Sequence, residues 1–174
     1  MNAIVNGVRP SQTFVMFDSV NPMVIPANHW VAGYLNGRYA WPDSSWDRFP
    51  GHVKISVLGG QPRVARFARV LDVESGDATD SDVVPFVRER LATRRTDATI
   101  YCNRDTLPAV RAALADAGLE AGKDCRLWVA TLDGTKTIQD MSGVWAIQDQ
   151  GGVLAPYDIS TGYGPADFVH PARP

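Results

Sequence analysis

Hydrophobic positions along the chain fall into short runs rich in β-branched residues, and polar or turn-forming residues interrupt these runs repeatedly. The run Phe14–Phe17 is apolar at every position, which is typical of parallel strands that are covered on both faces. The pattern predicts strands at Thr13–Asp18, Trp30–Asn36, His52–Leu58, Ala68–Glu74, Ala98–Asn103, Arg126–Leu132, Val144–Asp149 and Tyr157–Ser160.

Two stretches between these strands have the spacing of amphipathic helices. The first runs from about Ser81 to Arg95 and has candidate N-cap residues at positions 80–82. The second begins near Thr106 and is followed by Gly118, which suits a left-handed helix stop. A shorter helical turn is expected within Trp41–Phe49.

Strands that alternate with helices predict an α/β fold, here a compact, irregular (β/α)8-type TIM barrel. A complete barrel usually takes about 250 residues. This chain has 174, so several helices must be missing. The links at 59–67 and 150–156 are too short for a helical crossover, and we expect bare loops or antiparallel pairing among the late strands. We assign residues 1–12 to an N-terminal extension, 13–163 to the barrel and 164–174 to a C-terminal tail.

The composition is that of an ordinary globular domain, with 45% hydrophobic residues, 21% charged residues and a formal net charge of −2. We expect no nucleic-acid partner, because the densest basic run, Arg88–Arg95, includes acidic and apolar residues and is typical of a solvated helix face. We also expect no membrane partner, since no apolar stretch approaches the roughly 20 residues that a span needs. No signal peptide is visible at the N-terminus.

No motif for a metal or a cofactor is found, and we expect neither. The histidines His29, His52 and His170 lack metal-ligand spacing. The paired glycines lack the Lys-Ser/Thr that completes a phosphate-binding loop. Cys102 and Cys125 are assigned to opposite ends of neighbouring strands, so buried thiols are expected rather than a disulfide.

Candidate chemistry lies in carboxylates within the predicted strands. Asp72 and Glu74 are two residues apart, so both point to one face of their strand, about 6–7 Å apart along it. Asp18 closes the first strand and Asp158 lies in the last, and these strands are neighbours in a closed barrel. Any one of these acids could be a strand-end cap or a turn former. All of them at the same end of their strands favour a site, because glycoside hydrolysis uses one protonated and one ionised carboxyl.

The stretches around these acids resemble the family-25 glycoside hydrolases, the lysozyme-type muramidases, and still more their short glycoside-hydrolase-like relatives in actinobacteria and their phages. The similar stretches are MFDSVNP, GYLNGRYAWP, LDVESGDAT, TIYCN and LWVA, and the resemblance covers roughly Phe14 to Tyr163. It implies a retaining glycosidase that acts on peptidoglycan, with Glu74 as the general acid. Asp72 would orient the N-acetyl group of the substrate or support the oxocarbenium-like state, and Asp18 and Asp158 would complete the acidic floor.

The same resemblance implies a sugar groove lined by aromatic and amide side chains. These are Tyr34, Tyr101, Asn103, Trp128 and Gln148. Aromatic rings would stack on sugar faces and the amides would hydrogen-bond hydroxyl or N-acetyl groups, although the aromatics could equally be barrel packing. The chain departs from the family pattern at Leu132, near which an aromatic is commoner, and at Asp149, where a tyrosine often stands.

The resemblance thus predicts a phage lysin or a virion-associated protein that degrades cell walls, located in the cytoplasm of the producing cell or on the virion. The alternative is a catalytically inactive barrel that binds glycan or serves as a structural component, because a fold does not guarantee its usual activity. In either case the N-terminal extension and the C-terminal tail could dock on virion proteins.

Overall fold

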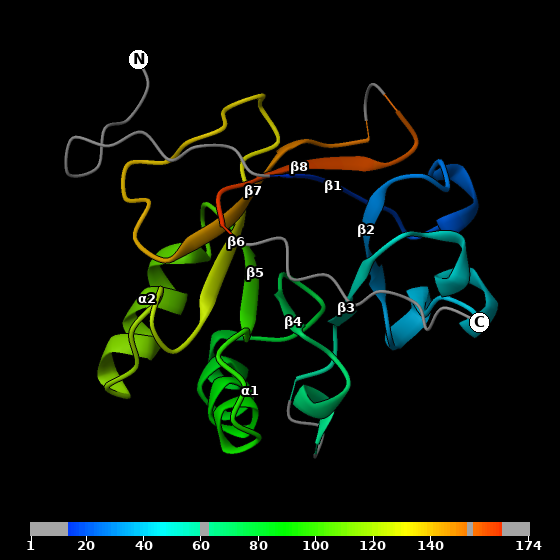
Figure 1. Ribbon diagram of the computed structural model, residues 1–174. Helices are drawn as coiled ribbons and strands as arrows, with labels where there is room; N and C mark the ends of the chain where they lie inside the picture. Colours follow the sequence, from blue (N-terminus) through cyan, green and yellow to red (C-terminus); the bar gives the residue numbers. More distant parts are fainter. Residues whose placement is uncertain (1–13, 60–62, 153–154, 165–174) are drawn as a thin grey trace.

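A computed structural model describes residues 14–59, 63–152 and 155–164 of the chain and shows a closed barrel of eight strands in sequential order (Figure 1). The strands are β1 (Phe14–Asp18), β2 (Trp30–Tyr34), β3 (His52–Ser56), β4 (Val70–Val73), β5 (Thr99–Asn103), β6 (Arg126–Ala130), β7 (Val144–Gln150) and β8 (Asp158–Gly162). All the predicted strands are confirmed, and most are one to three residues shorter than expected. The expected extension and nearly all of the tail lie outside the described residues.

The strands β1 to β7 are parallel to their neighbours, whereas β8 is antiparallel to both β7 and β1. The link between Gln150 and Asp158 is too short to cross the barrel, so the chain returns as a hairpin. Antiparallel pairing among the late strands is thereby confirmed. We call the barrel end formed by the carboxyl ends of β1–β7 and the amino end of β8 the mouth.

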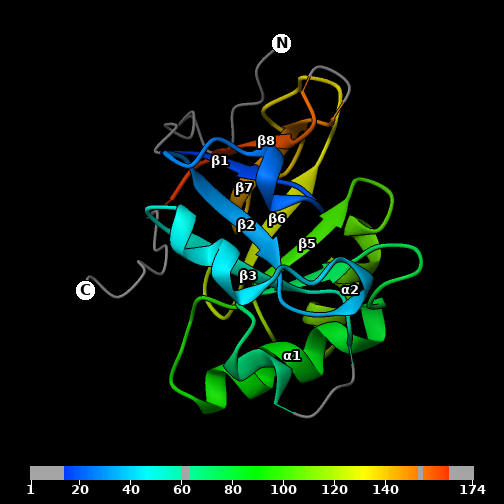
Figure 2. The ribbon, with the colours of Figure 1, turned by 90° about the vertical axis from the view of Figure 1, so that its right-hand side faces the viewer.

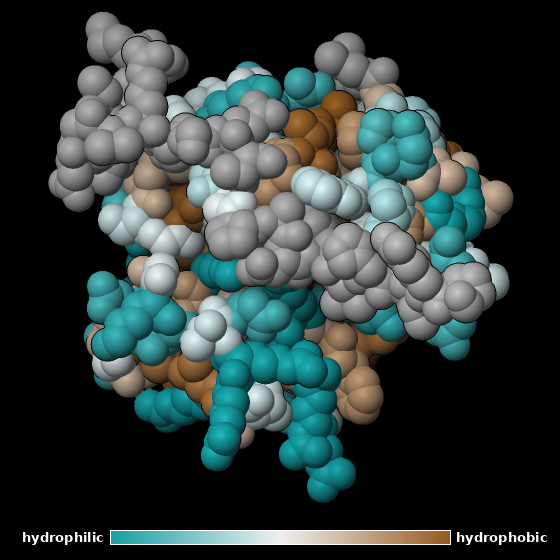
Figure 3. Space-filling view, in the orientation of Figure 1, coloured by the Kyte–Doolittle hydropathy of each residue, from teal (hydrophilic) through white to brown (hydrophobic). Residues whose placement is uncertain are grey.

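Two α-helices, α1 (Asp80–Ala92) and α2 (Leu107–Asp116), pack on each other and against β4 and β5 (Figures 1 and 2). Hydrophilic side chains cover the exposed side of α1 (Figure 3). The N-cap of α1 is Thr79, which forms a capping box with Asp82, so the expected cap at 80–82 is wrong. Gly118 has a φ of +70°, which confirms the left-handed stop after α2.

Short 3-10 helices take the place of further α-helices: Pro22–Val24, Gly37–Tyr39, Asp43–Arg48 and Val64–Arg66. The third of them lies within the helical turn expected at Trp41–Phe49. A cluster of Trp41, Trp46 and Phe49 packs with Val31 of β2. Aromatic side chains thus cover the flank of the barrel that has no α-helix, and the fold is dominated by strands rather than by a strict (β/α)8 alternation.

The barrel interior is filled by the side chains that point inward from each strand, including Met16, Val53, Val70, Trp128 and Ala146. A second core lies between the strands and the two α-helices. Because side chains alternate along a strand, the residue two positions after an interior residue also points inward. The inward-pointing positions of each strand therefore continue to the end of the strand that lies at the mouth.

Cys102 and Cys125 are buried free thiols. No helix in the described ranges is long and apolar enough to cross a membrane. Within the same ranges there is no group of three or more His, Cys, Asp or Glu side chains that could hold a metal ion.

Candidate active site

Four carboxyl groups extend the interior rows to the mouth. Asp18 lies two positions after the interior residue Met16 in β1, and Asp72 lies two positions after Val70 in β4. Glu74 comes directly after the end of β4. Asp158 is the first residue of β8, so the expectation that all four acids lie at the same end of their strands is wrong for this residue. Because β8 is reversed, its amino end lies at the mouth, and Asp158 pairs in register with Asp18.

Two of these carboxyl groups are buried without a complete set of partners. Asp18 is 4% exposed and Asp72 is 3% exposed. Asp18 Oδ2 and Asp72 Oδ1 have no hydrogen-bond partner among the described residues. Buried polar atoms are normally satisfied, and those that are not are often found at functional sites. Both oxygens are therefore available to a ligand or to ordered water.

Burial raises the pKa of all four carboxyl groups, and repulsion from neighbouring acids raises the pKa of Asp18, Asp72 and Glu74 further. The pKa of Asp72 rises to about 8, first because of burial and then because of Glu74 and Asp77. Burial raises the pKa of Asp18 well above its ordinary value, and the charges of Asp158, Asp72 and Glu74 raise it further. The pKa values of Glu74 and Asp158 are also raised, mainly by burial.

Every neighbouring charge that perturbs these pKa values is an acid, and no basic side chain in the described part of the chain contributes. Because the pKa of Asp72 is about 8, these carboxyl groups do not all ionise at neutral pH. The cluster therefore retains at least one proton, which is the state that a general acid needs.

Amide side chains hold the more exposed pair of acids. Two backbone N–H groups, of Asp105 and Thr106, donate to Asn103 Oδ1 at 3.0 Å each, which leaves the amide nitrogen to donate to Glu74. This hydrogen bond lowers the pKa of Glu74 against the effect of burial. The turn after β5 thus fixes the orientation of the donor that faces Glu74.

On the other side of the mouth, the Tyr101 hydroxyl donates to Gln148 Oε1 at 2.5 Å. The Gln148 amide and the backbone N–H of Gly152 then hydrogen-bond Asp158, which lowers the pKa of this acid against the effect of burial. The structure brings the predicted residues Tyr101 and Gln148 together with the acids. Both are largely buried, and their hydrogen bonds orient the Asp158 carboxyl.

The predicted aromatic residues occupy different depths. Tyr34 is half-buried at the mouth end of β2, and burial and the charge of Asp18 raise the pKa of its hydroxyl. Trp128 is 0% exposed and donates from its indole nitrogen to Ser160 at 2.9 Å, so it cannot stack on a sugar in this structure. The residue of β6 that reaches the mouth is Ala130. The expectation that Trp128 lines the groove is corrected accordingly.

Sequence reasoning missed Asp77 at the mouth, and it named Leu132 only as a departure from the family pattern. Asp77 raises the pKa of both Asp72 and Glu74, and all three acids belong to the LDVESGDAT stretch. Leu132 is 53% exposed with a φ of +57°, a conformation that branched side chains rarely adopt. A side chain built at Gly151 would approach both Leu132 and Asp158, which places this exposed leucine at the edge of the acid cluster.

A cavity of about 360 Å³ lies beside Glu74. Its walls come from the turn between β4 and α1, including Ser75 and Thr79, and from Asp105 and Thr106 at the start of α2. Glu74 is only partly buried and faces this space, whereas Asp72 lies below. The arrangement can deliver a proton from a partly exposed carboxyl to a bound polar molecule.

No family model matches the sequence, and no curated protein matches it. Among solved structures, the fold is similar to that of a muramidase from Trichobolus zukalii, with a TM-score of 0.52 and 13% sequence identity. The similarity covers 89% of this chain and 96% of that chain. At this identity the likeness shows a shared barrel fold.

Proposed function

We propose that this protein is a glycoside hydrolase of the muramidase type that acts on peptidoglycan. The observation that carries the proposal is the convergence of four carboxyl groups with raised pKa values at one barrel mouth, with no basic side chain among the groups that perturb them. Glycosidic bond cleavage needs a carboxylic acid beside a carboxylate, and this cluster holds both. The barrel shared with a muramidase supports the same choice of substrate.

In the proposed mechanism, Glu74 is the general acid. It is the more accessible member of the Asp72–Glu74 pair, and the cavity beside it lets the leaving oxygen of the substrate reach the Glu74 carboxyl. The pair shares a proton near neutral pH, and in the free protein the buried Asp72 holds it more strongly, since its pKa is about 8. A substrate N–H group that donates to Asp72 would favour the Asp72 anion and shift the proton to Glu74.

The ionised Asp72 would then orient the acetamido group of the sugar, whose carbonyl oxygen attacks the anomeric carbon as Glu74 protonates the leaving oxygen. Water afterwards opens the intermediate with Glu74 acting as the base, so the configuration is retained. Asp158, whose hydrogen bonds to Gly152 and Gln148 favour its ionised form, supplies negative charge that stabilises the positive charge developing on the sugar. Asp18, whose pKa burial raises well above its ordinary value, lies beside it and completes the acidic floor. Activity is expected to fall as pH rises past about 8, where the pair loses its shared proton.

The test is the release of reducing sugar from purified peptidoglycan by the wild type and by Glu74→Gln. Loss of a general acid removes about 10²–10⁴-fold of rate, so the variant should fall to near background. Glu89→Gln makes the same chemical change on α1, away from the mouth, and should retain full activity.

Folded wild-type protein that releases no sugar between mildly acidic and neutral pH would overturn the proposal. If such protein still bound glycan, the conclusion would be that the barrel binds glycan without cleaving it. The lysin or virion-associated setting is supported by the sequence resemblance alone and is part of the proposal on that basis.

A further inference from the structure

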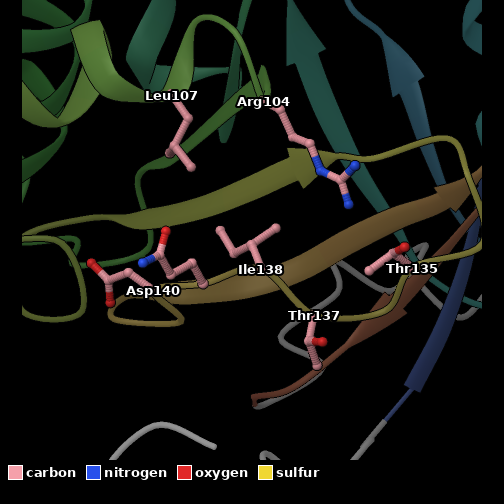
Figure 4. A pocket seen from close by; sticks show the side chains of 7 residues that line it. Arg104, Leu107, Thr135, Thr137, Ile138 and Asp140 are labelled. Carbon is pink, nitrogen blue, oxygen red and sulfur yellow. The ribbon is translucent and has the colours of Figure 1, made fainter. Parts of the chain in front are cut away.

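The connection between β6 and β7 is an irregular loop, residues 131–143, in a place where a regular barrel has a helix. The loop leaves β6 at the mouth and returns to the amino end of β7. A cavity of about 530 Å³ lies between this loop and the start of α2 (Figure 4). Arg104 and Leu107 form one wall, and loop residues within 135–140 form the other.

The loop is fixed at both ends, so the cavity is preformed. At the mouth, Arg104 Nη1 lies 2.7 Å from Asp133 Oδ2. At the far end, Arg111 of α2 donates to the carbonyl oxygens of Asp140 and Ser142 at 3.0 and 3.1 Å. These contacts fix the loop ends and reduce the ordering that a ligand would have to impose.

Between these anchors the main chain is open. The backbone groups of Thr137 and Gln139 form no hydrogen bond with the described part of the chain. Main-chain donors and acceptors without partners are what an added peptide segment pairs with. Their position in the wall of a cavity, rather than on a convex surface, gives such a segment a defined place.

The side chains of the cavity suit a short peptide that carries a carboxylate at one end. The cavity has one cation, Arg104, and one acid, Asp140, whose Oδ2 lies 3.3 Å from Arg111 Nη1. Leu107 and Ile138 lie between its two ends and pack against the core, which suits a small apolar side chain (Figure 4). The guanidinium of Arg104, 44% exposed, lies toward one end near Thr135. Of its donors, only Nη1 is used within the described residues, which leaves Nη2 for a carboxylate of the ligand.

We propose that this cavity binds the peptide stem that peptidoglycan carries on its muramic acid sugars. Arg104 directly follows Asn103, the residue whose amide donates to Glu74, so the cavity begins next to the acid cluster. A stem attached to a sugar at the cleavage site covers about 3.3 Å per extended residue, so a peptide of several residues extends well beyond the sugar. The identity of the peptide rests on the proposed function.

The test is a titration of isotope-labelled protein followed by NMR, with the soluble peptide L-Ala-γ-D-Glu-L-Lys as the probe. The amide signals of residues 135–140 and of Arg104 should shift. Arg104→Ala removes a charge-assisted hydrogen bond, and the affinity should fall about tenfold. Arg104→Lys keeps the ion pair with Asp133 but not the fork, so it should show a smaller loss. Arg66→Ala removes an exposed arginine elsewhere and should change nothing.

A peptide that shifts no signal in the loop, or binds Arg104→Ala as well as the wild type, would overturn the inference. A chitin tetrasaccharide added to Glu74→Gln serves as the second probe. If it shifts residues 135–140, the cavity is a sugar subsite and the inference is wrong. Peptide binding requires no turnover, so it can fail while reducing sugar is released, and it can succeed when none is.

Discussion

Replacement of Asp72 by asparagine tests the physical basis of the site without any assay of function. The side chain is 3% exposed, and Oδ1 has no hydrogen-bond partner among the described residues. Its pKa rises from 3.8 to about 8 on folding. The folded protein therefore holds this carboxyl in a place where the anion is strongly disfavoured. Asparagine has nearly the same shape and cannot ionise.

The sign of the effect follows from proton binding. Between pH 4 and pH 8 the folded state binds more protons at Asp72 than the unfolded state, so wild-type stability falls as pH rises through this window and levels off above it. The rise of the Asp72 pKa from 3.8 to about 8 corresponds, by linkage, to an upper limit of roughly 5–6 kcal/mol. Sharing of the proton with Glu74 and relaxation around the anion reduce this, and we expect about 2 kcal/mol.

The assay is urea unfolding of the wild type and Asp72→Asn from pH 4 to pH 9. The variant should match the wild type near pH 4 and exceed it by about 2 kcal/mol at pH 9, a rise of roughly 4–8 °C in Tm for a domain of this size. Asp133→Asn is the control of opposite sign, because hydrogen bonds to the exposed Asp133 lower its pKa to about 2. It should not be stabilised at any pH in this range.

A stability difference between wild type and Asp72→Asn that does not change with pH would refute the reasoning. It would mean that Asp72 ionises in the folded protein as easily as in the unfolded chain. A cation or a water network that stabilises the Asp72 anion would then have to be present.

Two further predictions concern the scaffold. Gly33→Ala should destabilise the protein by about 1–3 kcal/mol in urea unfolding, because its methyl carbon would lie 2.6 Å from the buried ring of Trp41; unchanged stability would show that the ring can move. Arg90→Met should cost about 3 kcal/mol, since the buried guanidinium binds Asp97 and two backbone carbonyls, whereas the exposed Arg95→Met should change stability by less than about 0.5 kcal/mol.

The strands could be predicted from the sequence because their signal is local. Apolar, β-branched runs bounded by turn residues identify each strand, and the alternation of side chains then places Asp18 and Asp72 on inward-facing rows. The short link before Asp158 also contained the information that the last strand reverses. Its consequence, that an acid at the start of a strand reaches the same mouth, needed the topology.

Other features depend on partners far away in the sequence. The basic run 88–95 was expected to be a solvated helix face, which is wrong for Arg90, since it is 3% exposed. Its guanidinium donates to the carbonyl oxygens of Ala65 and Ala68, in the connection before β4. No local pattern distinguishes this arginine from its neighbours.

Trp128 shows the limit of counting along a strand. Its place near the end of β6 suggested the groove wall, yet the inward row continues to Ala130, which pairs with Asn103 on one side and Gln148 on the other. The indole therefore lies one layer lower, where it contacts the ring of Tyr101 edge-on. Which layer a residue occupies depends on the stagger between strands, and the sequence does not contain it in readable form.

The layer at the mouth is also the reason to regard the site as functional. A barrel selected for stability alone would fill this layer with apolar side chains, since buried acids without cations lower stability. Here β1, β4 and β8 place acids in it, while β6 contributes only the small Ala130, two positions after Trp128. If Asp72→Asn gains stability and loses activity, the acid is retained for catalysis. If it gains stability and keeps activity, Asp72 is not part of the reaction, and Glu74 must draw its proton from the cluster without it.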